Sequence, residues 1–462
     1  MVRLFLFCLL IWGTALGCRQ KPDPQPTPQP PTDTTRPDTT RPTGPGFAIA
    51  TADLAIYEVN LQAQGAAGRF AAFTPQLDSI RALGCNTVWL MPIHPIGQLR
   101  SAGGLGSPYA IRDYTATNAE FGSLAEFKAL VQAAHTRKLR VILDWVANHT
   151  AWDHPWITAH PDWYVRQNGQ IIIPPGTNWN DVAELDYTNP AMRLAMIEAM
   201  RFWVREAGVD GFRCDAADFV PADFWRQALD SLIREPAPMP LILLAEGSQV
   251  AQWNAGFGMT FGWSFYDRLK QVLATTVPTA LTTTHLAERN GATEGKYRLR
   301  YTTNHDKTAW EETPIEAFGG LDRSMAAFAT LLAYGEVPMV YNGQEVGWPQ
   351  RTPIFTRSTI NFNANPAIKA AYRRLLQFRA QTPALRTGSL TTLSTPFMVA
   401  ILRQTAAQEA LVVVNVRSTP QTFERPASLA PTGWTNLQGQ PDSLPARLTL
   451  PPFGYTCLRR VR

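Results

Sequence analysis

Short hydrophobic runs alternate with amphipathic stretches along residues 50–383. The runs have the length and composition of β-strands, and the eight candidates span residues 54–61, 86–93, 140–147, 210–215, 241–246, 259–265, 297–304 and 337–343. Between them, Ser123 and Glu126 form a capping-box pattern that begins a helix. Because eight strands alternate with helices, the pattern predicts an α/β fold of the (β/α)8 barrel type rather than an open doubly wound sheet.

Two further segments depart from this alternation. A long loop, residues 150–188, follows the third strand, and loops of this length in a compact domain are usually functional. After Pro383 the pattern changes to short β-rich runs. We therefore expect a barrel over residues 48–383, a small inserted domain over residues 150–188, and a C-terminal β-sandwich over residues 384–462.

The N-terminal segment has the pattern of a secretory signal. Residues 1–17 contain basic Arg3, an apolar run and small residues before Cys18, and the run is too short for a membrane span. The segment resembles a bacterial lipoprotein signal, whose cysteine is lipidated, although Ala15 stands where leucine is commonest. Residues 18–47 are rich in Pro and Thr, so they predict a disordered tether. We expect a cell-envelope protein anchored by lipid at Cys18, in the outer membrane or facing the periplasm.

Composition narrows the possible partners. The 462 residues are 45% hydrophobic and 17% charged, and the net charge is +5 without a long run of Lys or Arg. We therefore expect no nucleic-acid partner. Once Cys8 leaves with the signal and Cys18 carries lipid, the cysteines that remain are too few and too widely spaced for a disulfide framework or a cysteine metal site: Cys85, Cys214 and Cys457.

Acidic side chains are predicted at the ends of four of these strands: Asp144, Asp215, Glu246 and Asp306. The carboxyl ends of barrel strands meet at one mouth, which is where the chemistry of such barrels takes place. Arg213 shares a strand face with Asp215, because alternate residues of a strand point the same way. Alone, that pair is more often a structural ion pair. With several close carboxylates, which raise each other's pKa, and with His149 and His305 nearby, a catalytic mouth explains the pattern better.

The motifs resemble those of one enzyme family. Four segments look like the ordered signatures of the α-amylase family of retaining α-glycoside hydrolases, glycoside hydrolase family 13: "DWVANH" (144–149), "GFRCDAADFVP" (211–221), "LLAEG" (243–247) and "TTNHD" (302–306). Two more resemble the loop after its second strand and the segment before its third helix: "GLGSPYAIRDY" (104–114) and "ELDY" (184–187). The resemblance implies a (β/α)8 barrel with a B domain inserted after strand three and a C-terminal sandwich.

By this resemblance, Asp215 is the nucleophile, Glu246 the general acid/base and Asp306 the stabiliser of the transition state. Retention needs an attacking carboxylate beside a carboxyl that protonates the leaving oxygen. Arg213 would keep Asp215 ionised, and Asp144 would support the site through Arg213.

The resemblance also implies binding residues. Tyr109, His149 and His305 match residues that contact the bound sugar. The chemistry needs no cofactor, but Asn148 matches a position that binds a structural calcium in many members, with Asp181 as its partner. Calcium prefers several oxygen ligands, of which these are only part.

Some positions depart from the family pattern. Many α-amylases have Lys-His shortly after the nucleophile to hold sugars on the leaving-group side, whereas this chain has Asp218 and Phe219. Ala216 favours α-1,4 over α-1,6 bonds by resemblance. Four loop tryptophans either stack on glucan or pack the insert: Trp152, Trp156, Trp163 and Trp179.

The leading hypothesis is a retaining hydrolase of α-glucosidic, mainly α-1,4, bonds in starch-type glucans or maltooligosaccharides. An exo-acting α-glucosidase or a transglycosylase would use the same residues. A non-catalytic glucan-binding lipoprotein is a distant alternative, because it would not need all three acids.

Overall fold

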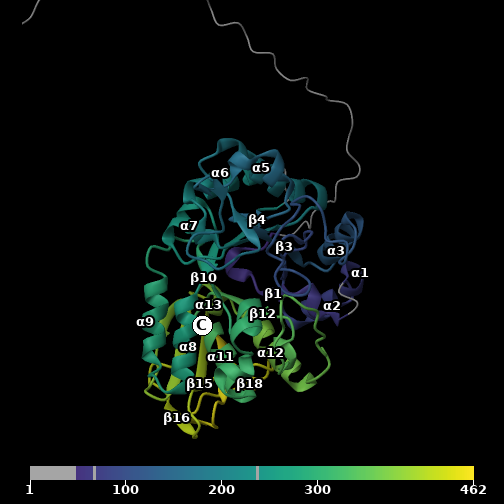
Figure 1. The fold of residues 1–462 in the computed structure, drawn as a ribbon. Coiled ribbons are helices and arrows are strands. Elements are labelled where there is room, and N and C mark those ends of the chain that lie inside the picture. Colours follow the sequence, from purple (N-terminus) through teal and green to yellow (C-terminus); the bar gives the residue numbers. More distant parts are fainter. Residues whose placement is uncertain (1–47, 66–68, 236–238) are drawn as a thin grey trace, which may run out of the picture. The chain divides into compact units, whose positions relative to one another are not determined.

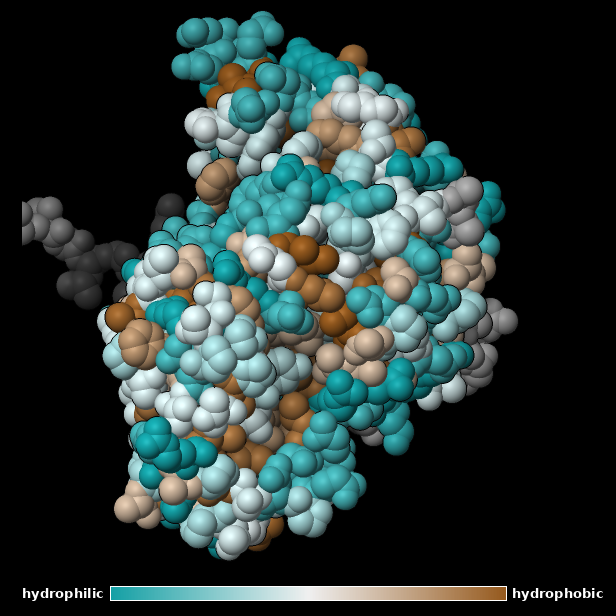
Figure 2. Space-filling view, turned by 90° about the horizontal axis from the view of Figure 1, so that it is seen from below, coloured by the Kyte–Doolittle hydropathy of each residue, from teal (hydrophilic) through white to brown (hydrophobic). Residues whose placement is uncertain are grey.

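The computed structural model describes residues 48–65, 69–235 and 239–462. The predicted signal, tether and lipidation site at Cys18 lie outside these residues. Among the helices described, none is long and apolar enough to cross a membrane. Hydrophilic and hydrophobic side chains are interspersed on the face seen in Figure 2.

Eight parallel strands close into a barrel in the order β1-β12-β11-β10-β9-β8-β3-β2. Their bounds are Ile56–Val59 (β1), Thr87–Leu90 (β2), Arg140–Val146 (β3), Gly211–Asp215 (β8), Ile242–Ala245 (β9), Met259–Phe261 (β10), Tyr297–Arg300 (β11) and Val337–Tyr341 (β12). Every residue of β3 is buried, as is usual for a parallel strand covered on both faces. The predicted (β/α)8 fold is confirmed.

Every barrel strand is shorter than the run that predicted it, and two of the strand ends bear on the site and its neighbours. β10 ends at Phe261, and the rest of its hydrophobic run belongs to a helix that begins at Trp263. β11 ends at Arg300, so Asp306 lies in the segment beyond the strand. Hydrophobicity alone did not mark these ends, because aromatic residues follow both strands: Trp263 and Phe265 after β10, and Tyr301 after β11.

The helices of the barrel domain alternate with its strands (Figure 1). Their bounds are Phe70–Phe73 (α1), Gln76–Leu83 (α2), Leu124–Thr136 (α3), Pro190–Phe202 (α5), Ala222–Ile233 (α6), Val250–Ala255 (α7), Trp263–Ala274 (α8), Thr279–Glu288 (α9), Pro314–Phe318 (α10), Leu321–Leu332 (α11), Pro366–Ala380 (α12) and Pro383–Thr387 (α13). The predicted capping box of Ser123 and Glu126 begins α3. A π-helical turn, Trp203–Ala207, continues α5 and ends at Gly208, whose φ of 65° suits glycine.

The insert after β3 is small. It contains Pro155–Ala159 (α4) and four short strands, His149–Ala151 (β4), Arg166–Gln167 (β5), Gln170–Ile171 (β6) and Val182–Glu184 (β7). β4 pairs antiparallel with β7, and β5 with β6. The pairing of His149 with Glu184 begins the insert directly at the end of the barrel.

The C-terminal strands, coloured yellow-green to yellow in Figure 1, form a six-stranded sheet in the order β13-β14-β15-β20-β17-β18 and a two-stranded sheet of β16 and β19. Their bounds are Ser389–Thr392 (β13), Met398–Gln404 (β14), Gln408–Asn415 (β15), Gln421–Glu424 (β16), Trp434–Thr435 (β17), Pro441–Asp442 (β18), Arg447–Leu450 (β19) and Tyr455–Val461 (β20). On β14, Val399 and Ile401 join the core of the barrel, whereas Met398 and Leu402 join a separate core with Trp434. The sheet therefore buries both faces.

Candidate active site

A cleft of about 510 Å³ lies at the carboxyl ends of the barrel strands. Six of the predicted site residues line it. They are the three acids predicted to react and three side chains predicted to contact the sugar: Asp215, Glu246, Asp306, Tyr109, His149 and His305. The other two predicted residues, Arg213 and Asp144, are fully buried and bonded to this group. The barrel therefore brings all eight side chains into one site.

Asp215 is the last residue of β8, and Glu246 directly follows β9. Asp144 does not end β3, as the sequence suggested, but lies two residues before the strand's last residue, Val146. In the register of the two strands it pairs with Arg213. Asp144 consequently lies deeper in the barrel than Asp215.

Arg213 joins three carboxyl groups. Its Nη1 donates hydrogen bonds to Asp144 Oδ1 at 2.6 Å and to Asp215 Oδ1 at 2.8 Å. Its Nη2 forms an ion pair with Glu246 Oε1 at 2.7 Å. Because this guanidinium is buried, its charge is poorly screened and acts on all three groups. Arg213 therefore fixes the distance between the two acids that are predicted to react.

The two acids differ in their protonation. Burial raises the pKa of Asp215 to about 6 against the opposing charge of Arg213. Burial also raises the pKa of Glu246, to about 7, with Asp215 adding to the rise and Arg213 opposing it. Between these values Asp215 is mostly ionised while Glu246 keeps its proton. This is the division needed for a nucleophile beside an acid.

A strained turn connects the two strand ends. Ala216, the residue after Asp215, has a φ of 43°, in the left-handed region that L-residues avoid. Its backbone N–H donates to Glu246 Oε2 at 2.8 Å. The backbone N–H of Glu246 in turn donates to the carbonyl of Cys214 at 2.8 Å. The unfavourable φ of Ala216 thus accompanies a hydrogen bond that orients the acid.

A second network contains His305. Its Nε2 lies 2.7 Å from Tyr109 Oη and 3.4 Å from Asp306 Oδ1. Tyr109 Oη donates to Asp144 Oδ2 at 3.2 Å, and the rings of Tyr109 and His305 stack at 5.5 Å. This network joins the Arg213 group at Asp144. The two predicted sugar contacts are therefore also fixed by the protein.

Glu58 belongs to the site, although the sequence analysis did not identify it. It is fully buried in β1, and its Oε1 lies 2.5 Å from His305 Nδ1. Burial alone would lower the pKa of His305, but the charges of Asp306 and Glu58 raise it to about 9. A lone acid inside the hydrophobic run of residues 54–61 was the signal that could have identified it.

Comparisons with known proteins agree with this geometry. The family profile described as "Alpha amylase, catalytic domain" matches residues 50–236, which include β1, β3 and β8 with the nucleophile candidate Asp215. The chain carries an alpha-amylase family catalytic domain.

Solved structures of the alpha-amylase family cover nearly the whole chain. A maltogenic alpha-amylase of Thermotoga neapolitana is 27% identical with a TM-score of 0.78, covering 90% of this chain and 100% of that one. An alpha-amylase of Lactobacillus plantarum is 26% identical with a TM-score of 0.79, covering 89% and 99%.

Curated relatives match over shorter parts. A maltosyltransferase of Rhodospirillum rubrum that acts between alpha-1,4-glucan and maltose 1-phosphate is 35% identical over 222 residues, 43% of this chain and 32% of the relative. An alpha-amylase of Haloarcula japonica is 27% identical over 409 residues, 81% of this chain and 57% of the relative. The chain thus spans between about a third and three fifths of these relatives.

One wall of the alpha-amylase cleft is aromatic. His149 lies against Trp179 with ring centroids 5.4 Å apart, and burial lowers the pKa of His149 to about 4, so its imidazole is neutral. Trp179 also stacks on Phe219, with centroids 5.9 Å apart and an interplanar angle of 26°. Trp179 remains 36% exposed and Phe219 56% exposed. Such exposed rings can bind the apolar faces of a sugar.

Asp218 binds the segment that follows Glu246. Its carboxylate accepts the backbone N–H of Ser248 at 2.9 Å and Gln252 Nε2 at 3.0 Å. A side chain at Gly247 would come within 2.4 Å of Asp218 Oδ1, so only glycine fits there. The position that carries lysine in many α-amylases therefore connects two loops here.

The other loop tryptophans pack the insert. Trp156 contacts His154, Tyr114 and Trp163. The Arg100 guanidinium covers the Trp152 ring at 3.9 Å. Of the four predicted tryptophans, Trp179 is the one among the cleft residues.

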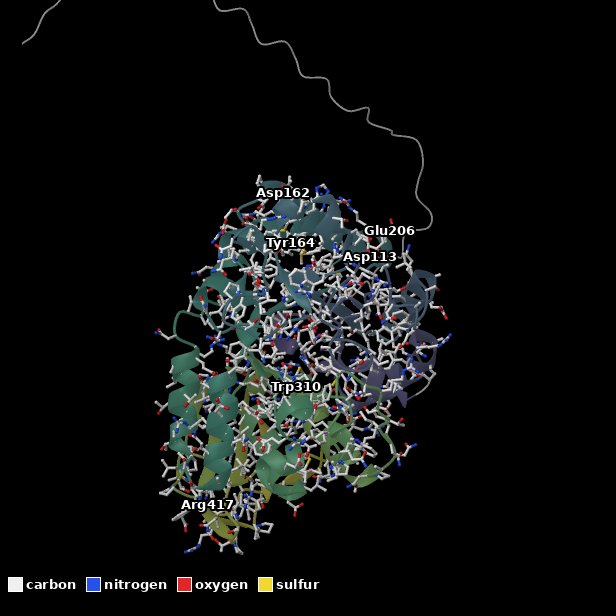
Figure 3. The ribbon with its side chains drawn as sticks, in the orientation of Figure 1. Asp113, Asp162, Tyr164, Glu206, Trp310 and Arg417 are labelled. Carbon is white, nitrogen blue, oxygen red and sulfur yellow. The ribbon has the colours of Figure 1, made fainter. Side chains whose placement is uncertain are left out.

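A second aromatic wall was missed by the sequence analysis. Trp310 is 56% exposed and contacts Phe355 with centroids 5.1 Å apart, and both line the cleft. Figure 3 shows Trp310 apart from Asp162 and Tyr164 of the insert. Its place, four residues after Asp306, was the available signal.

The two residues predicted to bind calcium each have other surroundings in the structure. Asn148 Nδ2 donates to Glu184 Oε2 at 3.0 Å, and burial raises the pKa of Glu184 to about 7. Asp181 lines the cleft, and burial raises its pKa too. No group of three or more acidic, His or Cys side chains among the described residues is arranged to hold a metal. Calcium also binds amide and backbone carbonyl oxygens, so a site formed by Asn148 and Asp181 stays a prediction.

Proposed function

We propose that this alpha-amylase family enzyme hydrolyses α-glucosidic bonds with retention of configuration. Asp215 is the nucleophile, Glu246 the general acid/base and Asp306 the stabiliser of the positive charge that develops on the sugar ring. Arg213 keeps Asp215 ionised, and Tyr109, His149 and His305 contact the bound sugar. Asp144 acts through Arg213.

The observation that carries the proposal is the single guanidinium shared by Asp215 and Glu246, at 2.8 Å and 2.7 Å. Retaining enzymes need their two carboxyl groups about 5–5.5 Å apart, and one guanidinium between them holds a short separation. The higher pKa of Glu246, about 7 against about 6 for Asp215, supports the same assignment.

In the first step, Asp215 attacks the anomeric carbon while Glu246 gives its proton to the leaving oxygen, and the glycosidic bond breaks. Glu246 is then ionised and takes a proton from water, whose oxygen attacks the same carbon and releases Asp215. Two inversions give net retention. The positive charge of Arg213 favours the ionised form of Asp215 at the start and after release.

We propose α-1,4-glucans and maltooligosaccharides as substrates. Three aromatic residues of the cleft, Trp179, Trp310 and Phe355, would support an extended sugar chain across it, and Phe219 stacks on Trp179 beside them. The printed names of the relatives, an alpha-amylase, a maltogenic alpha-amylase and a glucan maltosyltransferase, support the same substrate class. Product analysis on starch, maltoheptaose and pullulan tests this: mixed maltooligosaccharides indicate endo action, and glucose alone indicates an exo-acting α-glucosidase. Release of sugars from pullulan without any cleavage of maltoheptaose would contradict a preference of the enzyme for α-1,4 bonds.

Transglycosylation is a second candidate function, which one observation favours. Phe219 lies on the loop after Asp215, which Asp218 connects to the loop after Glu246, and Phe219 stacks on Trp179 of the cleft. By the family resemblance, this position is on the leaving-group side of the site. An aromatic pair there favours a sugar acceptor over water. Phe219→Ala and Trp179→Ala should lower the ratio of transfer to hydrolysis at high maltotriose, whereas Trp310→Ala should not. An unchanged ratio in both variants would contradict this role.

The distant alternative is a non-catalytic glucan-binding lipoprotein. It predicts glucan binding without turnover, so any release of reducing sugar that Asp215→Asn abolishes would exclude it. The proposed chemistry needs no cofactor, so activity should survive dialysis against a chelator; a loss that calcium restores would instead support a structural ion.

We also propose that the enzyme is exported and anchored to the cell envelope by lipid at Cys18, in the outer membrane or facing the periplasm. The support is the signal-like sequence of residues 1–17 and the Pro- and Thr-rich segment that follows. Nucleic acid is not expected as a partner.

A further inference from the structure

Glu58 is a buried acid for which the proposed chemistry has no use so far. In β1 it pairs with Trp89 of β2 on one side and with Tyr341 of β12 on the other. It is fully buried. Burying a carboxylate is costly unless a partner compensates for the loss of water. The group that compensates for the burial of Glu58 should therefore show what this carboxylate does in the protein.

That partner is His305. Glu58 Oε1 lies 2.5 Å from His305 Nδ1, and Glu58 Oε2 has no hydrogen-bond partner among the described residues. Glu345, another buried acid at this end of the barrel, has a hydrogen-bond partner for each of its two carboxylate oxygens. Its Oε1 accepts the Tyr57 hydroxyl at 2.8 Å, and its Oε2 accepts the backbone N–H of Gly343 at 2.9 Å. Glu345 thus serves the local fold, whereas Glu58 acts on His305.

The Glu58 contact sets the direction of a chain of hydrogen bonds. An ionised Glu58 accepts from Nδ1–H and stabilises an imidazolium, so Nε2 also carries a proton and is a donor. Nε2 then donates to Tyr109 Oη at 2.7 Å, and the Tyr109 hydroxyl donates to Asp144 at 3.2 Å. Asp144 in turn accepts from Arg213. A neutral His305 with its proton on Nδ1 would have to accept from Tyr109, and Asp144 would lose that donor.

We propose that Glu58 is a positioning residue that keeps His305 doubly protonated, so that Nε2 always presents a proton to Tyr109, Asp306 and the bound sugar. This inference rests on the proposed function, because it gives Glu58 a purpose in the same reaction. It acts through His305 and does not contact the substrate.

Several charged or titratable groups face this pair. Asp306 favours the imidazolium as Glu58 does, whereas Arg213 and burial oppose it. Burial raises the pKa of Glu58, and His305 opposes that rise and favours the ionised form of Glu58. Tyr341, on β12, keeps its proton because burial and the charge of Glu58 raise its pKa. Asp144 lies next along the chain of hydrogen bonds, and His305 favours its ionised form. With Glu58 replaced by a neutral amide, the charged imidazole would lose the carboxylate that contacts its Nδ1, and Asp306 and Asp144 would be the acids that still favour it.

The first experiment compares Glu58→Gln with the wild type by the pH profile of kcat/KM. An aryl α-maltoside with a good leaving group is the substrate, because its cleavage does not need the proton of Glu246. We expect the kcat/KM values of the two enzymes to agree within about threefold at pH 6. At pH 8 the value for Glu58→Gln should be lower by at least tenfold, since above its pKa each unit lost from the pKa of His305 lowers the protonated fraction of this histidine tenfold. Glu345→Gln is the matched control, with a profile of wild-type shape. A loss for Glu58→Gln that is equal at all pH values would overturn the proposal.

The second experiment needs no activity and no Glu58 variant. The ¹⁵N spectrum of histidine-labelled wild-type protein at pH 8 should contain a doubly protonated imidazole that is absent from His305→Gln. A neutral His305 at pH 8 would overturn the proposal, including the case in which Glu58→Gln does not fold. Failure of the proposed function would instead leave the wild type unable to cleave the maltoside, whatever the histidine spectrum shows.

Discussion

Arg213 determines much of the chemistry at the scale of single residues. Its charge is shared by Asp144, Asp215 and Glu246, so none of these carboxyl groups titrates independently. Burial raises the pKa of all three acids, and Arg213 limits the rise. Burial thus shifts the two acids that we expect to react upward by similar amounts, and the ordinary order of the two residue types, with Glu above Asp, is kept.

The first prediction separates these two acids. Asp215→Asn should reduce cleavage of every substrate by several orders of magnitude, because no covalent intermediate can form. Glu246→Gln should lose far more activity on starch than on an activated aryl α-maltoside, because the aryloxide group of the maltoside leaves without needing a proton. Reducing-sugar release and aryl release measure the two rates.

Added azide gives an internal control for Glu246→Gln. Azide attacks the anomeric carbon of the sugar bound to Asp215, and the ester bond to Asp215 breaks without a general base. Two inversions make the product the α-glycosyl azide. A β-azide, or equal losses on both substrates, would mean that the two roles are wrongly assigned.

The second prediction concerns pH. Activity on starch needs an ionised Asp215, which is lost as the pH falls through about 6, and a protonated Glu246, which is lost as the pH rises through about 7. We expect a bell-shaped profile of kcat/KM with its maximum between about pH 6 and 7. With the activated maltoside the limb near pH 7 should disappear, and its persistence would contradict the acid role of Glu246.

Sequence identified most of this site because its residues lie in short motifs. Asp215, Glu246 and Asp306 were predicted in that way, and the cleft contains all three. Glu58 and Trp310 lie outside the motifs that were recognised, and their importance depends on contacts between distant strands and loops. Spacing along the chain cannot show such contacts.

Secondary-structure elements were likewise predictable where their sequence signals are local. The eight strand regions and the start of α3 were predicted, because strand runs and capping boxes are local signals. The ends of β10 and β11 were not, because aromatic residues continue past the last residue of each strand. The π-helical turns Trp203–Ala207 and Lys307–Glu311 also have no local pattern that marks them.

The third prediction is made at the scale of one helix. Asn189 caps α5 by accepting the backbone N–H groups of Ala191 and Met192, and its amide donates to Asp162 of the insert, labelled in Figure 3. Asn189→Ala should lower the free energy of unfolding by about 1 kcal/mol. Asn189→Ser, which keeps a cap but not the bond to Asp162, should lose less. Urea unfolding of both variants measures this, and equal stability of Asn189→Ala and wild type would contradict it.

The described part of the chain is held together from the barrel to the C-terminal sheet. Arg403 of β14 donates to the carbonyl of Tyr334 after α11, and Arg417 donates to the carbonyl of Val272 in α8. Alternate residues of β14 enter two different cores. The C-terminal sheet is consequently part of the support of the barrel, and its removal should destabilise the catalytic domain.

The last prediction concerns the whole molecule. If Cys18 carries the lipid, Cys18→Ser should leave the enzyme exported but unlipidated, because the site of attachment is lost. The variant should move from the membrane to the soluble fraction, and its kcat and KM on maltoheptaose should equal those of the wild type. Cys85→Ser is a matched control, since that buried cysteine of the barrel has no role in anchoring and its loss should leave the protein at the membrane. Fractionation with immunoblotting and a mass measurement of the N-terminal peptide would decide the matter. A membrane-bound Cys18→Ser protein would show that something other than lipid at this residue holds the enzyme there.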